Sequence, residues 1–116
     1  MDLSKLKFKG DVTIFNAPEG IVSTSLVENT NEVLAFIRNK AELQTFLDNE
    51  LSKCKYDALL WFAYPKGTSG IKTDINRDIL WKLAEPYGIR PVSMVSLDGT
   101  WSAIRFRPIE VVKTSK

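Results

Sequence analysis

Histidine is absent from the 116-residue sequence. This absence excludes Ser-His-Asp and Cys-His catalysis, zinc and haem sites with histidine ligands, and proton transfer by imidazole near neutral pH. Any chemistry must come from carboxylates, lysine, tyrosine or the backbone. The sequence therefore favours a protein that is not an enzyme, and it predicts no cofactor and no metal site.

Cysteine occurs once, as Cys54. A single cysteine excludes an internal disulfide and every CxxC metal or redox motif. The flanking Lys53 and Lys55 are positive charges of the kind that lowers the pKa of a thiol. Because there is no histidine to act as a base, we interpret Cys54 as an ordinary residue just ahead of a strand.

Long apolar runs and a strong net charge are also missing. The longest apolar run, 58–64, is far shorter than the roughly 20 residues that cross a membrane. A formal net charge of +2 is too small to indicate nucleic-acid binding. The basic segment MDLSKLKFKGD lacks the apolar core of a signal peptide. We expect a cytoplasmic protein that forms one domain over residues 1–116, with a short C-terminal tail at 109–116.

Five segments have strand patterns. The β-branched segment 12–16 predicts the first strand, and the apolar runs 33–37 and 58–64 predict strands buried on both faces. The segments 92–97 and 101–107 flank Asp98-Gly99, and we expect this dipeptide to supply the positive φ of a tight hairpin turn. Residues 19–31 fit either a short helix or an irregular covering segment.

Two segments have helix patterns. Asn39 and Glu42 have the spacing of a capping box, and an apolar stripe follows them, formed by Leu43, Phe46, Leu47 and Leu51. We predict that Asp74 is the N-cap of the second helix and that Gly88 lies beyond its end. On that helix a second stripe is formed by Ile75, Ile79, Leu83 and Tyr87, with Leu80 near its edge.

The order of these segments predicts the fold class. Buried strands that alternate with helices favour parallel pairing, and the final two strands form an antiparallel hairpin. We therefore predict a single α/β domain with a mixed five-stranded sheet, made of a parallel core and a C-terminal antiparallel hairpin, packed with two main helices. The pattern leaves the strand order open.

The segment 61–81, WFAYPKGTSGIKTDINRDILW, predicts a ligand site. A strand end, a Gly/Ser/Thr loop with two lysines and a helix start meet here, and unpaired N–H groups at such places bind anions. The loop is not a P-loop, because only two residues separate Gly67 from Gly70 and Ile71 stands between Gly70 and Lys72. The alternative is a solvated loop. The candidate ligand-binding residues are Lys66, Thr68, Ser69, Lys72, Asp74, Arg77, Asp78 and Arg105.

The second interpretation is a domain that binds another protein or a second copy of itself as a homodimer. Its surface would be formed by Trp81, Trp101 and the hairpin edge. Trp81 lies off the apolar stripe of its helix, so either another segment such as 19–31 covers it or it binds a partner. Arg77, one turn earlier, is placed to stack on its ring.

Two further interpretations remain open. Alternation places Trp101 and Arg105 on one face of the last strand, which suits nucleic-acid binding but equally protects a sheet edge; we expect no nucleic-acid partner. A histidine-free enzyme would depend on Lys66, Asp74 or Asp78. The best-supported expectation is a non-enzymatic binding domain for a small anion or a protein partner at 65–78.

Two segments, LLWFAYPKGTSGIKTDINRD and DGTWSAIRFRP, resemble a family of small bacterial proteins classed as a domain of unknown function. The shared features are a Tyr-Pro-Lys turn, a TDINRD-like helix start and a terminal WSAxRFR strand, so the resemblance covers roughly the C-terminal half. It implies no activity, cofactor or catalytic residue. The positions it implies to be shared are Pro65, Lys66, Asp74, Asn76, Arg77, Asp78, Trp101, Ser102 and Arg105.

Overall fold

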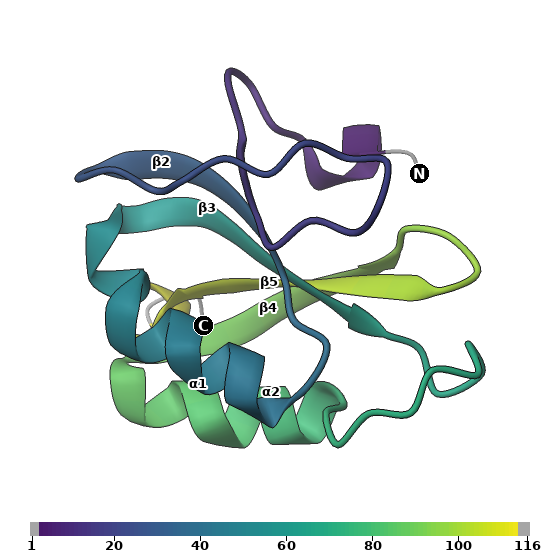
Figure 1. Cartoon of the computed structure of the whole chain (residues 1–116). Helices are drawn as coiled ribbons and strands as arrows, with labels where there is room; N and C mark the ends of the chain where they lie inside the picture. The colour runs from purple at the N-terminus through teal and green to yellow at the C-terminus, as the bar shows by residue number, and fades with distance from the viewer. Residues whose placement is uncertain (1–2, 114–116) are drawn as a thin grey trace.

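Five strands form one mixed sheet in a computed structural model that describes residues 3–113 (Figure 1). The spatial order is β1-β2-β3-β5-β4. The strands are β1 (Thr13–Phe15), β2 (Thr30–Phe36), β3 (Cys54–Pro65), β4 (Ile89–Ser96) and β5 (Trp101–Pro108). β1, β2 and β3 pair in parallel, whereas β5 pairs antiparallel with both β3 and β4. The predicted fold class is therefore confirmed, and β5 lies between β3 and the edge strand β4.

The two main helices follow the second and third strands, and a short third helix follows the last strand. They are α1 (Lys40–Asn49), α2 (Arg77–Ala84) and the short α3 (Ile109–Lys113), with 3-10 turns η1 (Leu3–Leu6), η2 (Leu51–Lys53) and η3 (Glu85–Tyr87). α3 falls within the segment predicted as a tail, whose last residues 114–116 lie outside the described residues. No described helix has the length and apolar character needed to cross a membrane.

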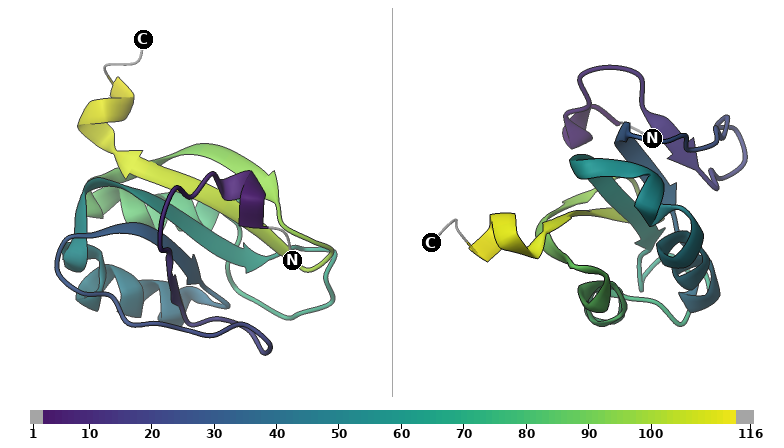
Figure 2. Two further views of the ribbon diagram at one scale, coloured as in Figure 1. Left: turned by 90° about the horizontal axis from the view of Figure 1, so that it is seen from above. Right: turned by 90° about the vertical axis from the view of Figure 1, so that its left-hand side faces the viewer.

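α1 and α2 cover one face of the sheet (Figures 1 and 2). The core on this face contains Phe46 of α1, Phe62 of β3 and Phe106 of β5, which pack edge to face with ring centroids 5.2 Å apart. Leu80 and Ala84 of α2 are fully buried in the same core. The centre of the helix face is therefore tightly packed.

The N-terminal segment 3–12, which we call the arm, lies across the opposite face (Figure 2). Leu6 of the arm is fully buried against a second core, which includes Trp61 of β3 and Trp101 of β5. The Trp61 indole Nε1 donates a hydrogen bond of 3.1 Å to the carbonyl of Leu6. Apart from η1, the arm has no regular secondary structure.

The start of each helix shows which capping predictions were right. Asn39 is the N-cap of α1, and its side chain accepts a hydrogen bond from the N–H of Glu42 at 2.9 Å, as predicted. For α2 the prediction was wrong, because the N-cap is Asn76, whose side chain accepts from the N–H of Ile79. Asp74 lies two residues too early and instead accepts from the N–H of Lys40, in the first turn of α1.

The buried face of α2 also differs from the prediction. Leu80 and Ala84 form its centre, while Ile79 and Leu83 are only partly buried. Tyr87 lies beyond α2, in η3, and its exposed ring is held by hydrogen bonds with Asp48 and Gln44 of α1. The α-helix ends at Ala84, earlier than the apolar stripe suggested, so Tyr87, the last residue of the stripe, is not on the helix.

The hairpin between β4 and β5 is present, but its turn has a different mechanism. Gly99 does not have a positive φ, unlike Gly88, where the chain leaves η3 with φ 86°. The Asp98 carboxylate instead accepts hydrogen bonds of 2.8 Å from the N–H groups of Thr100 and Trp101. When an aspartate side chain accepts hydrogen bonds from the backbone in this way, the turn forms without a residue in the left-handed conformation.

Candidate functional site

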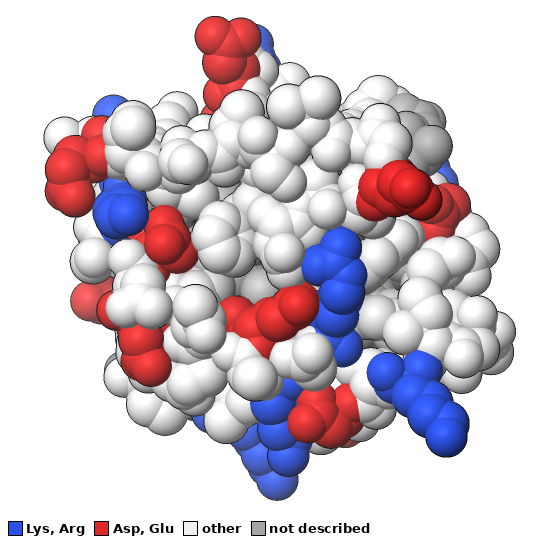
Figure 3. Space-filling view, viewed as in Figure 1, with Lys and Arg blue, Asp and Glu red and all other residues white. Residues whose placement is uncertain are grey.

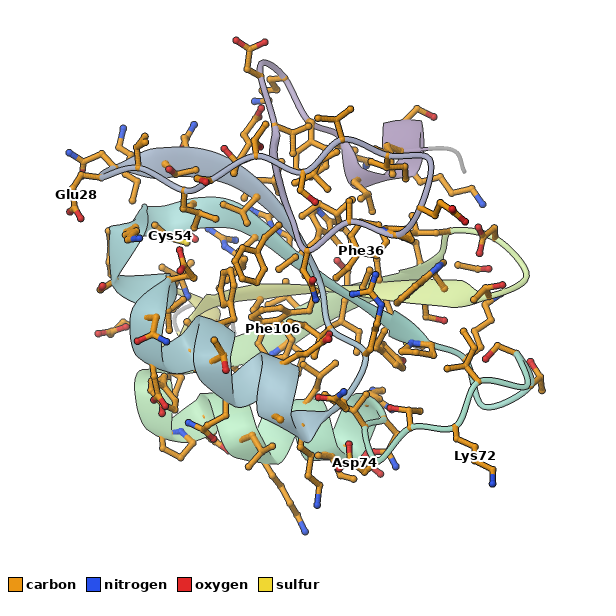
Figure 4. The ribbon with its side chains drawn as sticks, viewed as in Figure 1. Glu28, Phe36, Cys54, Lys72, Asp74 and Phe106 are labelled. Carbon is orange, nitrogen blue, oxygen red and sulfur yellow. The ribbon has the colours of Figure 1, made fainter. Side chains whose placement is uncertain are left out.

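Two polar side chains of the loop 66–76, those of Thr73 and Asp74, tie the loop to the start of α1. The Thr73 hydroxyl donates to the carbonyl of Arg38 and accepts from the N–H of Ile75, and Asp74 bonds to the start of α1. Figure 4 shows Asp74 between the starts of α1 and α2. The helix starts that were predicted to receive an anion are therefore capped by side chains of the protein itself.

The lysines and small residues of this loop do not converge on a hollow. The Lys66 ammonium donates to the hydroxyl of Ser96 at 2.6 Å, and the Ser69 hydroxyl accepts from the N–H of Ile71. Thr68 is exposed, and Lys72 points away from the body of the protein (Figure 4). None of the five main cavities along residues 3–113 is lined by residues 66–76.

Arg77 and Asp78 lie at the start of α2, near the hydroxyl of Tyr64. Burial raises the pKa of Tyr64, and the negative charge of Asp78 acts in the same direction, while Arg77 opposes it. Neither Arg77 nor Asp78 forms an ion pair among residues 3–113. Arg105 is remote from them on the arm face, so the candidate ligand-binding residues do not form one cluster.

The two candidate tryptophans have different environments. Trp81 is 36% exposed and lines a shallow groove of about 260 Å³ with Arg77 and residues 91–94 of β4. The interpretation that residues 19–31 cover it is wrong, because Trp81 is exposed and no residue of 19–31 lines this groove. Trp101 is buried, packs against Phe36 at 5.0 Å, and receives the Arg38 guanidinium over its ring at 5.8 Å. Trp101 is thus a core residue.

The arm face contains a larger hollow. A cavity of about 520 Å³, which we call the arm cleft, lies between the arm and strands β2 to β5. Its apolar lining comes from Leu6, Leu59, Trp61 and Val95, and its neutral polar lining from Asn31 and Ser93. Its charged lining consists of Lys5, Lys7, Lys9, Glu32, Asp57 and Arg105. Cationic groups are therefore in excess there.

Both carboxylates of the arm cleft are already engaged. The oxygens of the buried Glu32 accept hydrogen bonds of 2.8 Å from the N–H groups of Lys9 and Gly10, which tie the arm to β2. Asp57 forms two hydrogen bonds, of 2.9 and 2.7 Å, with the Arg107 guanidinium. This hydrogen bonding holds the pKa of Asp57 below its ordinary value.

Arg105 has no such partner. Its Nε is buried without a hydrogen bond, and no ion pair holds the residue in the part of the chain that the structure describes. The Nε of Arg90 is in the same condition, but Arg90 pairs with Glu85 at 2.6 Å. Burial lowers the pKa of Arg105, and the neighbouring Arg107 lowers it further. The positive charge of Arg105 thus has no ion-pair partner among the described residues.

The arm supplies the other cations. Lys5 donates to the carbonyl of Ser96 at 3.0 Å, while the exposed Lys7 and Lys9 side chains make no hydrogen bond or ion pair with the described residues. By contrast, charges of both signs are interspersed on the face that carries α1 and α2 (Figure 3). In the lining of the arm cleft, cations outnumber carboxylates.

Two residues of the arm cleft have unusual backbone conformations. Lys7 and Asp57 have φ values of 61° and 57°, in the left-handed region that residues with a Cβ rarely occupy. Asp57 lies where the register between β2 and β3 shifts, which indicates a bulge at that place. Conformations of this kind cost on the order of 1 kcal/mol or more and cluster at binding sites.

The sequence interpretation found only Arg105 among the cations of this cleft. Lys5, Lys7 and Lys9 were noted as a basic N-terminus and used only to argue against a signal peptide. Their signal is the alternation KLKFK, in which apolar residues that anchor the segment to a sheet are interleaved with lysines. Nothing in that alternation indicates which face of the sheet the arm covers.

The remaining reactive groups are Cys54 and the carboxylates. Burial and the Glu50 carboxylate raise the pKa of the Cys54 thiol to about 11, so the flanking Lys53 and Lys55 do not lower it. Among residues 3–113, no three Cys, Asp or Glu side chains gather closely enough to hold a metal ion.

Comparison of the chain with protein-family models, curated proteins and solved structures gave no match. The resemblance of its YPK, TDINRD and WSAxRFR segments to a family stays a prediction, and the function is argued from this chain alone.

Proposed function

We propose that this protein is a non-enzymatic binding module that holds a small anionic ligand in the arm cleft. The observation that carries the proposal is Arg105, whose buried Nε has no partner and which faces a cavity with excess positive charge. Arg105 is half-buried, so an anion in the cleft would pair with the accessible part of its guanidinium. Anion binding was predicted for the loop 65–78; the proposal keeps that chemistry and moves it to the arm cleft.

Binding is favoured over catalysis by the state of the two carboxylates. Glu32 holds the backbone of the arm, and Asp57 holds Arg107, so neither is free to act as a general base. The groups left for a ligand are cations and neutral donors, which suit recognition of negative charge.

The test is an NMR titration of the ¹⁵N-labelled protein with inorganic phosphate at low ionic strength. We expect amide shifts at Lys7, Lys9, Glu32 and Arg105. Arg105→Gln should weaken binding at least about tenfold, because a hydrogen bond to a charged group contributes about 1.5–3 kcal/mol. Unfolding curves establish that the variant is folded.

Lys72→Gln is the matched control, since it removes one cation from the loop and leaves the arm cleft unchanged. Phosphate affinity should be the same in this variant as in the original protein. Shifts confined to 65–78 and abolished by Lys72→Gln would place the anion at the predicted loop. A protein with no shifts at millimolar phosphate would overturn the proposal.

A second candidate is protein interaction, including self-association, at the edge strand β4. Trp81, Val92 and Met94 are 36%, 40% and 54% exposed and border one edge of the sheet. Aromatic residues and methionine are enriched in interfaces. However, Pro91 and the register shift beside it blunt this edge against strand pairing. Light scattering over a range of concentrations tests the candidate: a monomer at all concentrations would exclude the homodimer.

A further inference from the structure

The charge of the arm cleft restricts the ligand. Its lining has four cationic side chains and two carboxylates, and one of these carboxylates, Asp57, already pairs with Arg107, so at least two positive charges are left unbalanced. A phosphate monoester carries about −1.5 to −2 charges at pH 7. A single carboxylate carries only one charge, so the monoester is the better electrostatic match.

The arrangement of the cations restricts the shape of the charged group. Arg105 belongs to β5, whereas Lys5, Lys7 and Lys9 belong to the arm on the other wall of the cavity. A group that contacts both walls needs acceptor oxygens that point in several directions. A phosphate offers three such oxygens, while a carboxylate offers two in one plane.

The size and the apolar lining restrict the rest of the ligand. A cavity of about 520 Å³ lies within the range of about 300–1,000 Å³ that is typical of pockets for organic ligands. Leu59 and Val95 are half-buried and give it an apolar wall beside Arg105. An inorganic ion alone would leave this wall in contact with water, so an organic part is favoured.

We infer that the ligand is an organic phosphate monoester whose phosphate contacts Arg105 and the arm lysines and whose apolar part lies against Leu59 and Val95. This inference rests on the proposed function, because it names the chemical class that the same cleft takes.

Three probes separate the parts of this inference: phenyl phosphate, inorganic phosphate and benzoate, each titrated by NMR into the intact protein. Phenyl phosphate should bind about tenfold more tightly than inorganic phosphate, because it adds burial of an apolar ring. It should also bind at least about tenfold more tightly than benzoate, which has the ring but a single charge. Val95→Thr should reduce the advantage of phenyl phosphate and leave the affinity for inorganic phosphate unchanged.

The outcomes distinguish this inference from the proposed function. If inorganic phosphate binds in the cleft and phenyl phosphate binds no better, the ligand class is wrong and the anion-binding module stands. Equal affinity for benzoate and phenyl phosphate would reject the phosphate group and leave an organic anion. If no probe shifts the cleft amides, both proposals fail. Release of phenol during the titration would contradict a function in binding alone.

Discussion

The two faces of the sheet are covered in different ways. On one face, α1 and α2 present continuous apolar stripes, and the aromatic series Phe46, Phe62 and Phe106 fills the space between helix and strand. On the other face lies the arm, which is anchored by Leu6 and by hydrogen bonds from Trp61 and to Glu32. The helix face has smaller hollows of about 270 and 260 Å³ at its margins, while the arm face has a cavity of about 520 Å³.

The difference follows from how each covering segment satisfies its backbone. A helix pairs its own N–H and C=O groups internally and can turn a row of side chains every three to four residues toward the sheet. The arm lacks this internal pairing, so the sheet must supply partners such as the Glu32 carboxylate. Because the arm is held to the sheet at only a few points, a cavity remains beside it, and charged side chains line that cavity.

Core truncation should give the largest contrast between the two faces. Phe62→Ala on the helix face should cost about 3–5 kcal/mol of unfolding free energy, because it opens a cavity in a tightly packed core. Leu6→Ala in the arm should cost about 2 kcal/mol, near the low end for such changes, because the arm can shift without disturbing the helices. Urea unfolding measures both values.

The control for this pair is Val22→Ala, which removes methyl groups from a side chain that is 82% exposed. It should change the unfolding free energy by less than about 0.5 kcal/mol. Equal costs for Phe62→Ala and Leu6→Ala would mean that the arm is as integral to the core as the helices.

Loss of the Glu32 tether should have a smaller effect, confined to the arm. Glu32→Gln leaves one acceptor oxygen for two backbone N–H groups, so one N–H loses its partner at a cost of about 1–3 kcal/mol. Amide hydrogen exchange at Lys7, Lys9 and Gly10 should speed up, while exchange in β3 stays the same. Glu28→Gln, at an exposed carboxylate, is the matched control. Uniform acceleration throughout the sheet would show that the tether acts on global stability instead.

The Asp57–Arg107 pair should have the smallest effect and a dependence on pH. The pKa of Asp57 is lower in the folded protein than in the unfolded chain, chiefly through its hydrogen bond with Arg107. The ionised pair therefore makes its full contribution to folding stability at pH values above the pKa of Asp57 in the unfolded chain. That contribution should disappear as the pH falls below about 4. Asp57→Asn should therefore cost at most about 1 kcal/mol at pH 7 and nothing near pH 2. Urea midpoints at the two pH values measure this, and a difference that persists at pH 2 would argue against the electrostatic origin.

Local patterns predicted the helix face well. The continuous apolar runs gave the buried strands, and Asn39 capped α1 as its spacing indicated. The cap of α2 was misplaced because Asp74 and Asn76 are both good caps, and contact between Asp74 and the start of α1 decided between them. The turn at Asp98-Gly99 was found with the wrong mechanism, since the aspartate side chain replaced the expected left-handed glycine.

The candidate site was predicted less well than the fold. The lysine-rich loop was recognised, but its polar groups bond to Arg38, Lys40 and Ser96, partners that lie far away in the sequence. Arg105 was the one cation of the arm cleft that was singled out. Arg105 is a candidate ligand-binding residue because it lacks a carboxylate partner, since Asp57 pairs with Arg107 rather than with Arg105.

The sequence by itself determined the class of fold, the order of its strands and helices along the chain, and the exclusion of histidine chemistry, because these depend on local periodicity and on residue types. Only the tertiary structure decided that β5 lies between β3 and the edge strand β4 and that the arm crosses the face opposite α1 and α2. These arrangements bring Lys5, Lys7 and Lys9 to Arg105 over about 100 residues of chain. Contacts over that separation depend on how whole faces pack, which no local pattern records.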